Sequence, residues 1–239
     1  MKVEIWSDVV CPWCYIGKRR FEAALERFGH RDEVEVEWKA FELDPTATSA
    51  SAAETARPDD YATRLAAKYG TSLEQARGML ASMTAAAAEE GLDFHFERAV
   101  RANTADAHQV VLLAGEHGLQ DAVEERLMRA CFTEGEAVGD REVLVRLAAE
   151  AGLDAEEVRA VLAEGRLLEA VRAEEAEAAA LGIRGVPFFV VDRRYGVSGA
   201  QPPEHLLAVL QRAWEDSRPL TLVGTGDDAA ACGPDGCAL

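Results

Sequence analysis

The apolar residues in the first forty positions follow two different periods. Val3 and Ile5 predict a short strand. Over residues 12–28, apolar side chains recur at i, i+4 and i+7, which predicts a helix with one buried face. Over residues 34–38, Val and Trp alternate with Glu, the period-2 pattern of a half-buried strand. The chain is therefore predicted to begin as strand, helix, strand.

The middle of the chain has helical spacing throughout. A small, polar stretch over 46–57 predicts a loop, and from residue 58 to 182 we find neither a strand pattern nor an internal repeat. Glycines at intervals mark plausible helix ends. Helices are predicted over residues 58–69, 72–90, 103–117, 121–131, 140–151, 154–163 and 166–181.

Strand character returns near the end of the chain. An apolar run over 186–191, a turn and a second short strand over 195–199 precede a helix that starts at Pro202. Neither end of the chain can form a covered sheet alone, so the two ends are expected to join in one α/β domain around a helical insertion. We expect this domain to span 1–48 and 182–220, the insertion 55–181 and a flexible tail 221–239.

Composition excludes several classes of protein. The 239 residues carry a net charge of −18, which disfavours binding to nucleic acid or to an anionic membrane surface. No stretch approaches the roughly 20 apolar residues of a membrane span. The first residues lack the cationic and apolar regions of a signal peptide. A cytoplasmic location is therefore expected.

The strongest chemical signal is Cys11-Pro12-Trp13-Cys14, which follows a predicted strand and opens a helix. The backbone N–H groups at a helix start favour a thiolate, and the thiolate is the reactive form of cysteine. Cys14 lies one turn further along, within reach of a disulfide. Cys11 is thus predicted to attack a substrate disulfide and Cys14 to release the product. Pro12 and Trp13 shape the turn and are candidates for substrate contact.

Two further features are open to more than one interpretation. Val186-Pro187 opens an apolar strand, and Pro187 fits either a cis peptide bond beside the active site or an ordinary trans proline. A cis bond would leave the Val186 backbone free to pair with an extended substrate. The tail pair Cys232 and Cys237 fits an auxiliary redox pair, an incidental sequence, or half of a four-cysteine zinc site with Cys11 and Cys14.

Cys131 stands on a predicted helix among apolar residues and is expected to be a buried core thiol.

Several segments resemble the cytosolic, FrnE-type branch of the DsbA family, over nearly the whole chain and in the same order: W-S-D-V-V-C-P-W-C-Y-I-G (6–17), N-T-A-D-A-H (103–108), F-T-E-G-E-A-V-G-D (132–140) and G-V-P-F-F-V (185–190). The resemblance implies a thioredoxin-like fold with a helical insertion. It implies Cys11 as nucleophile, Cys14 as resolving cysteine and Pro187 as the cis-proline. Some FrnE-type proteins resemble this chain in their tail cysteine pair, for which a relay role is suggested.

The expected function is thiol–disulfide exchange on protein or small-molecule disulfides and dithiols, with glutathione or a thioredoxin system as redox partner and no cofactor or metal. Asn103 is expected to cap a helix. His108 is either a surface or core-edge residue or a proton shuttle, and both residues are candidates for substrate binding. A glutathione-dependent isomerase of an aromatic or polyketide substrate is the enzymatic alternative, although related isomerases typically carry Ser in place of Cys11. A zinc-stabilised binding module is the non-enzymatic alternative.

Overall fold

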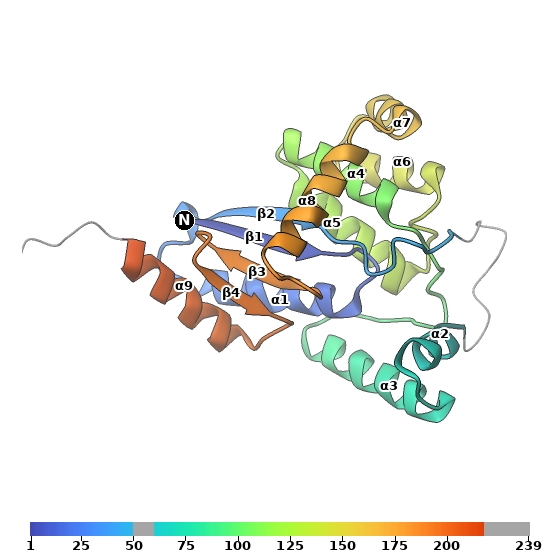
Figure 1. The fold of residues 1–239 in the computed structure, drawn as a ribbon, viewed down its shortest axis with the longest axis horizontal. Coiled ribbons are helices and arrows are strands. Elements are labelled where there is room, and N and C mark those ends of the chain that lie inside the picture. Colours follow the sequence, from blue (N-terminus) through green and yellow to red (C-terminus); the bar gives the residue numbers. More distant parts are fainter. Residues whose placement is uncertain (50–59, 218–239) are drawn as a thin grey trace, which may run out of the picture.

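A four-stranded mixed sheet forms the centre of the molecule. The computed structural model describes residues 1–49 and 60–217. In it, the strands lie in the order β2-β1-β3-β4, with bounds β1 Lys2–Ser7, β2 Glu35–Ala40, β3 Phe188–Val191 and β4 Tyr195–Ser198 (Figure 1). β1 runs parallel to β2 and antiparallel to β3, and β3 runs antiparallel to β4. The two ends of the chain therefore share one sheet, as the sequence predicts.

The strand β1 joins the two halves of this sheet residue by residue. Val3 lies opposite Val36 on one side and Val191 on the other. Two residues further along β1, Ile5 lies opposite Trp38 of β2 and Phe189 of β3. Because side chains alternate between the two faces of a strand, Val3 and Ile5 point into one core, and Glu4 between them points to the opposite face.

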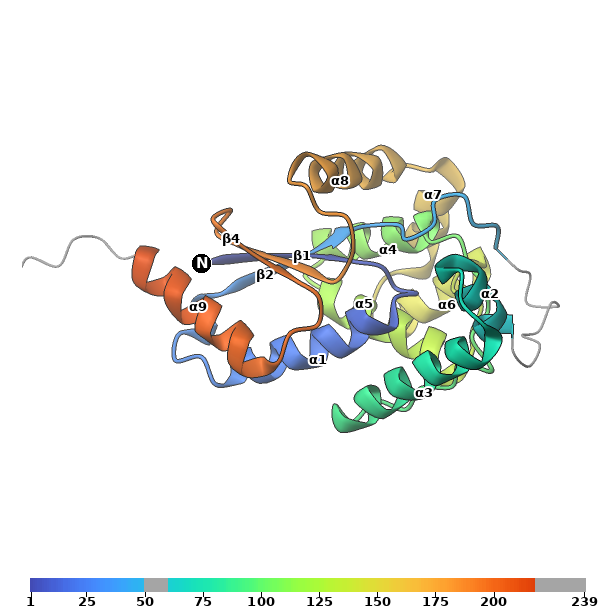
Figure 2. The same ribbon diagram turned by 60° about the horizontal axis from the view of Figure 1, so that its bottom comes forward.

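One face of the sheet is covered by the first and last helices. The helix α1 spans Pro12–Glu26 and α9 spans Pro203–Ser217, and the two lie side by side in both views (Figures 1 and 2). The ring of Phe21 in α1 stacks on that of Phe189 in β3, with 5.5 Å between the ring centroids. A short 3₁₀ turn, Arg31–Glu33, links α1 to β2.

A run of helices is inserted between β2 and β3, within a few residues of the positions that the sequence predicts. A π-helical turn, Ala130–Glu134, continues α5. The inserted helices are α2 Asp60–Tyr69, α3 Leu73–Glu89, α4 Ala105–Glu116, α5 Gln120–Arg129, α6 Arg141–Glu150, α7 Ala155–Glu164 and α8 Leu168–Ala180. No helix among the described residues is long and apolar enough to cross a membrane.

Buried polar contacts tie the insertion to the sheet. The side chain of Gln120 accepts a hydrogen bond from the Trp38 backbone N–H at 2.8 Å and donates one to the Trp38 carbonyl at 2.9 Å. On the opposite face, α8 crosses the sheet, and its Glu174 carboxylate accepts from the Ala40 N–H at 2.7 Å. The fully buried Trp6 indole donates to the Glu174 carbonyl at 3.1 Å. Since these groups are buried or partly buried, separating the insertion from the sheet would leave them without these partners.

Candidate active site

The two cysteines of the motif lie at the first turn of α1. Cys11 is the N-cap residue, with extended backbone angles of φ −95° and ψ 112°, and Pro12 fills the first helical position. Pro12 suits this position because its missing N–H would be unpaired there in any case. The Cys11 carbonyl accepts the Cys14 N–H at 3.0 Å, which begins the helix. Both are free thiols in the described structure, Cys11 is 4% exposed and Cys14 is fully buried.

The chain before β3 packs directly against this turn. The Val186–Pro187 peptide bond is cis, as the resemblance implies. The Cys11 thiol donates a hydrogen bond to the Val186 carbonyl, at 3.7 Å from sulfur to oxygen. Gly17 makes this packing possible, because a Cβ atom at that position would lie 2.8 Å from Cγ of Pro187. The sequence thus brings Cys11 and Pro187, 176 positions apart in the chain, into one site.

The remaining residues of the motif region divide into exposed and buried. Trp13 is 40% exposed and presents an apolar surface next to Cys11. Tyr15 is buried; its hydroxyl donates to Glu125 at 2.6 Å, and its ring stacks on Phe94 with 5.9 Å between centroids.

A cluster of buried polar side chains lies beneath Cys14. Ser7 ends β1, and its hydroxyl donates to Oε1 of Glu124 on α5 at 2.7 Å. The Asp8 carboxylate accepts the Leu43 N–H at 2.8 Å, and its oxygen Oδ1 lies 3.7 Å from Nε2 of His108. The distance of 3.7 Å between Asp8 and His108 is that of an ion pair and is too long for a hydrogen bond. These four polar side chains are all at most 2% exposed; they come from the end of β1, the residue after it, α4 and α5.

Burial governs the protonation of this cluster. Burial and the hydrogen bond to Cys11 raise the pKa of Cys14 well above its usual range, although a hydrogen bond from Ser7 opposes this shift. Burial raises the pKa of Glu124 to about 7, against the opposing effects of Ser7 and His108. Burial alone would lower the pKa of His108, but Asp8 and the nearby carboxylates outweigh it and the pKa is raised. A buried thiol that resists ionisation therefore belongs to the same part of the core as a buried carboxyl group whose pKa is raised to about 7.

The sequence analysis does not assign Ser7 or Glu124 to the site. The signal for Glu124 was present, since it shares the buried face of α5 with Val123, Leu127 and Met128. A carboxylate on an apolar helix face is rarely buried without a partner. The partner, Ser7, lies 117 positions earlier in the sequence, so that only the fold reveals the pair.

The other candidate residues occupy less direct positions. The N-cap residue of α4 is Thr104 and not the predicted Asn103, which lies one position earlier. The Asn103 side chain accepts the Ala105 N–H at 3.1 Å, and its amide donates to the Pro45 carbonyl. His108 is 2% exposed, so it is neither a surface residue nor part of an open cleft. Cys131 is buried as expected, and burial raises its pKa to about 12. The tail pair Cys232 and Cys237 lies outside the described residues.

No cluster of three or more potential metal-binding side chains occurs within residues 1–49 and 60–217. The hypothesis of a four-cysteine zinc site needs Cys232 and Cys237, and it stays a prediction.

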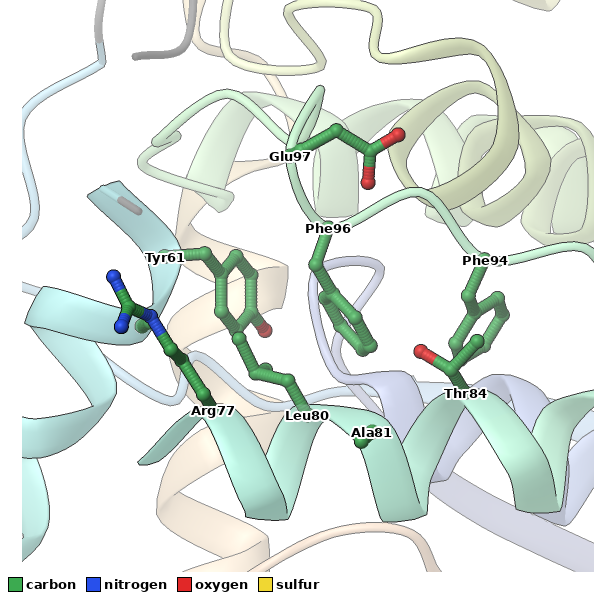
Figure 3. A pocket seen from close by; sticks show the side chains of 9 residues that line it. Tyr61, Arg77, Leu80, Ala81, Thr84, Phe94, Phe96 and Glu97 are labelled. Carbon is green, nitrogen blue, oxygen red and sulfur yellow. The ribbon is translucent and has the colours of Figure 1, made fainter. Parts of the chain in front are cut away.

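A cavity of about 280 Å³ opens beside the motif, between α2, α3 and the segment 93–97. Figure 3 shows the aromatic rings of Tyr61, Phe94 and Phe96 facing Leu80 and Ala81 of α3 across it. The Phe94 ring, which lines the cavity, is the same ring that stacks on Tyr15 of α1. The cavity is therefore separated from the first turns of α1 by one layer of aromatic side chains.

Several solved structures are similar to this chain. The chain is 50% identical to a probable DsbA oxidoreductase from Streptomyces coelicolor, with a TM-score of 0.84 over 100% of this chain and 99% of that one. The cytosolic disulfide reductase DsbM from Pseudomonas aeruginosa, crystallised with GSH, shares the fold at 22% identity, with a TM-score of 0.62 over 90% of this chain and 100% of that one.

A 2-hydroxychromene-2-carboxylate isomerase also shares the fold, at 16% identity and a TM-score of 0.64 over 90% of this chain and 97% of that one. The DSBA-like thioredoxin domain matches residues 2–211 of the chain. With its cysteine pair at the start of α1 and this match over most of its length, the chain belongs to the DSBA-like thioredoxin domain family.

Proposed function

We propose that the protein catalyses thiol–disulfide exchange, with Cys11 as nucleophile and Cys14 as resolving cysteine. The Cys11 thiolate attacks one sulfur of a substrate disulfide, a mixed disulfide forms, and the other substrate sulfur leaves as a thiolate. Cys14 then attacks Cys11, the Cys11–Cys14 disulfide forms, and the remaining substrate sulfur leaves with its electron pair. The substrate gains two electrons and two protons, and an external dithiol or two thiols return the enzyme to its reduced form.

The observation that supports this proposal best is the placement of the Cys11 sulfur. It lies at a helix N-terminus, where backbone N–H groups favour negative charge, and it lies beside the Val186 carbonyl with Cys14 one turn behind it. A complete cysteine pair favours exchange over isomerisation, since a reaction without a resolving step has no use for Cys14.

Substrate contact is proposed for the residues around this sulfur. Pro12 and Trp13 border Cys11 within the motif, and Val186 and Pro187 border it from the loop before β3. The residues that carry the exchange would belong to the thioredoxin-like segments 1–48 and 182–220, as the sequence predicts. The burial of His108 speaks against direct contact with substrate.

The cavity beside the motif suits one apolar side chain of a polypeptide substrate. Its volume of about 280 Å³ is just below that of most ligand pockets, and three of its nine lining residues are aromatic. Filling it with Ala81→Trp should raise the KM for a protein disulfide and leave the reaction with a small aromatic disulfide unchanged. An unchanged KM for the protein disulfide would remove the cavity from the proposal.

Reduction of insulin disulfides, driven by a thiol reductant, tests the activity directly. Cys11→Ser should abolish turnover, and Cys14→Ser should accumulate a mixed disulfide with substrate that mass spectrometry detects. Cys131→Ala is the matched control, because that thiol is buried and lies outside the motif, and it should retain activity. If the wild-type protein reduces no disulfide and Cys11→Ser changes nothing, the proposed function is wrong.

Glutathione is the reductant that we propose, in a cytosolic setting. The support is limited to the shared fold of a cytosolic disulfide reductase that was crystallised with GSH. Two coupled assays separate the alternatives, one with glutathione and glutathione reductase, the other with thioredoxin and thioredoxin reductase. Faster NADPH consumption in the thioredoxin assay would contradict the assignment of glutathione.

A further inference from the structure

The loop between α8 and β3 carries an arginine whose charge no carboxylate of the described chain neutralises. Arg184 is exposed, and within residues 1–49 and 60–217 its side chain makes no hydrogen bond and no ion pair. The chain has 43 acidic and only 25 basic residues, so that carboxylates are abundant. Exposed arginines elsewhere, such as Arg27 and Arg212, pair with one at 2.9 and 3.1 Å. Arg184 is therefore open to an anionic partner from outside the chain.

This arginine lies next to the part of the loop that contacts the reactive cysteine. Two residues after Arg184, the Val186 carbonyl accepts the hydrogen bond of the Cys11 thiol. One residue before it, the Ile183 side chain is only 4% exposed, and its backbone N–H donates to the Ala178 carbonyl at 2.9 Å. Since the chain is anchored on both sides, the backbone of Arg184 is held close to the active site.

The backbone between these two anchors is free to bind an extended substrate. Within the described part of the chain, the N–H groups of Arg184, Gly185 and Val186 form no backbone hydrogen bond. A Cβ atom added at Gly185 would meet no other atom within 4 Å, so this stretch is not covered by neighbouring side chains. Exposed backbone groups of this kind pair with an extended chain as an edge strand does. A substrate that pairs here passes directly by Arg184.

We propose that the Arg184 guanidinium binds a substrate carboxylate one residue beyond the reactive cysteine, and that the glycine carboxylate of glutathione is such a group. The proposal rests on the exchange reaction proposed above. In an antiparallel pairing of the substrate cysteine with Val186, the residues that follow this cysteine lie alongside those that precede Val186. In glutathione the next residue is the terminal glycine, whose carboxylate matches the paired N–H donors of a guanidinium.

The charge of the whole chain makes a local cation important for such a substrate. The net charge of −18 repels glutathione disulfide, which is itself an anion at neutral pH. The guanidinium of Arg184 offsets this repulsion near the reactive sulfur. The Cys11 thiolate attacks one sulfur of glutathione disulfide, a disulfide forms between Cys11 and that glutathione, and the other glutathione leaves as a thiolate. Arg184 holds the carboxylate of the half that stays bound.

A double-mutant cycle between the arginine and the carboxylate tests this contact. The parent protein is the full chain with Cys14, Cys232 and Cys237 replaced by Ser, so that the mixed disulfide at Cys11 accumulates. It reacts at pH 7 with glutathione disulfide or with the disulfide of glutathione glycine ethyl ester, which lacks the glycine charge. Acid quenching and mass spectrometry of the Cys11 peptide give the second-order rate constants for the parent and for Arg184→Gln.

The expected result is a loss that depends on the glycine carboxylate. Arg184→Gln should slow the reaction with glutathione disulfide on the order of ten-fold, and it should change the reaction with the ester by less than about two-fold. Arg184→Lys keeps the charge without the paired donors and should lose less than Arg184→Gln.

Arg212→Gln is the matched control. It removes the same charge from the last turns of α9, at the end of the sheet where β1 begins, whereas Cys11 follows the end of β1 (Figure 1). Its rate constants with both probes should match those of the parent.

Three outcomes would overturn the proposal: an unchanged rate with glutathione disulfide in Arg184→Gln, equal slowing with both probes, or the same slowing in Arg212→Gln. Equal slowing with both probes would mean that Arg184 does not bind the glycine carboxylate, and slowing in Arg212→Gln that only the net charge matters. Failure of the proposed function looks different, because the parent protein would then form no disulfide at Cys11 with either probe or with Ellman's reagent.

Discussion

The buried carboxyl group of Glu124 should make the free energy of unfolding depend on pH in a direction opposite to that of most glutamates. Its pKa in the folded protein is about 7, against an ordinary value of 4.5, and the cause is burial. Between these two values the folded protein keeps the proton that the unfolded chain releases. Stability must therefore fall as the pH rises through this window, and it must level off above pH 7.

The size of this effect follows from the two pKa values. Each pH unit over which the two states differ by one proton is worth about 1.4 kcal/mol. Integrated between pH 5 and pH 8, the Glu124 carboxyl accounts for a loss of about 2.5 kcal/mol. Glu124→Gln removes this dependence, and it also removes a carboxylate that raises the pKa of His108. From pH 5 to pH 8, the free energy of unfolding of Glu124→Gln should therefore rise by about 2.5 kcal/mol relative to that of the wild type.

Urea denaturation of both proteins under reducing conditions, at pH 5 and pH 8, measures this shift. Glu125→Gln supplies a control on the same helix whose pH dependence lies outside this range. Although burial opposes it, the hydrogen bonds from Tyr15 and Arg19 lower the pKa of Glu125, so its carboxylate stabilises the fold above the ordinary pKa of 4.5 and loses that effect only as the pH falls below it. Removing Glu125 should therefore cost nearly the same at pH 8 as at pH 5. A pH-independent difference for Glu124→Gln would refute the assignment of a raised pKa to this group.

Three further predictions concern other parts of the molecule. Gly17→Ala should destabilise the protein by roughly 1–3 kcal/mol in thermal or urea unfolding, because the added Cβ would lie 2.8 Å from Pro187, whereas Gly29→Ala, with no atom within 4 Å, should leave stability unchanged. Cys131, buried and with its pKa raised to about 12, should resist iodoacetamide at pH 8 until the protein unfolds, and mass spectrometry of the native protein would contradict this if it found the modified peptide. Replacing Cys232 and Cys237 by Ser should slow reduction of the Cys11–Cys14 disulfide and alter its reduction potential, and unchanged kinetics and potential would exclude a relay.

The sequence predicts the elements of this fold well because its periodic patterns are long and regular. The seven inserted helices appear within a few residues of the predicted bounds, since glycines mark several helix ends and the apolar spacing marks the helical interiors. The joining of β1 with β3 is predicted only from the need to cover a sheet, and the register of Val3 with Val191 is visible only in the structure.

The site is predicted less completely, for a physical reason. Cys11 and Cys14 can be recognised from the sequence, because a Cys-x-x-Cys pair between a strand and a helix is typical of thiol–disulfide chemistry. Ser7 and Glu124 carry no such spacing, since each is an ordinary polar residue until the fold places them 2.7 Å apart in a buried setting. The position of His108 is not predicted for the same reason. Its sequence neighbours do not reveal that Asp8 lies opposite it, and so its burial as part of an ion pair is unexpected.

The hydrogen bond between Ser7 and Glu124 has a consequence for how this chain and its relatives can diverge. The two positions belong to different structural parts and lie 117 residues apart, but loss of either side chain leaves the other with a buried polar group unpaired. A carboxylate buried without its hydroxyl partner is costly, and so is a buried hydroxyl without its acceptor. Substitutions at positions 7 and 124 should therefore be correlated across relatives. A relative that carries Ala at the first position should carry an uncharged residue at the second.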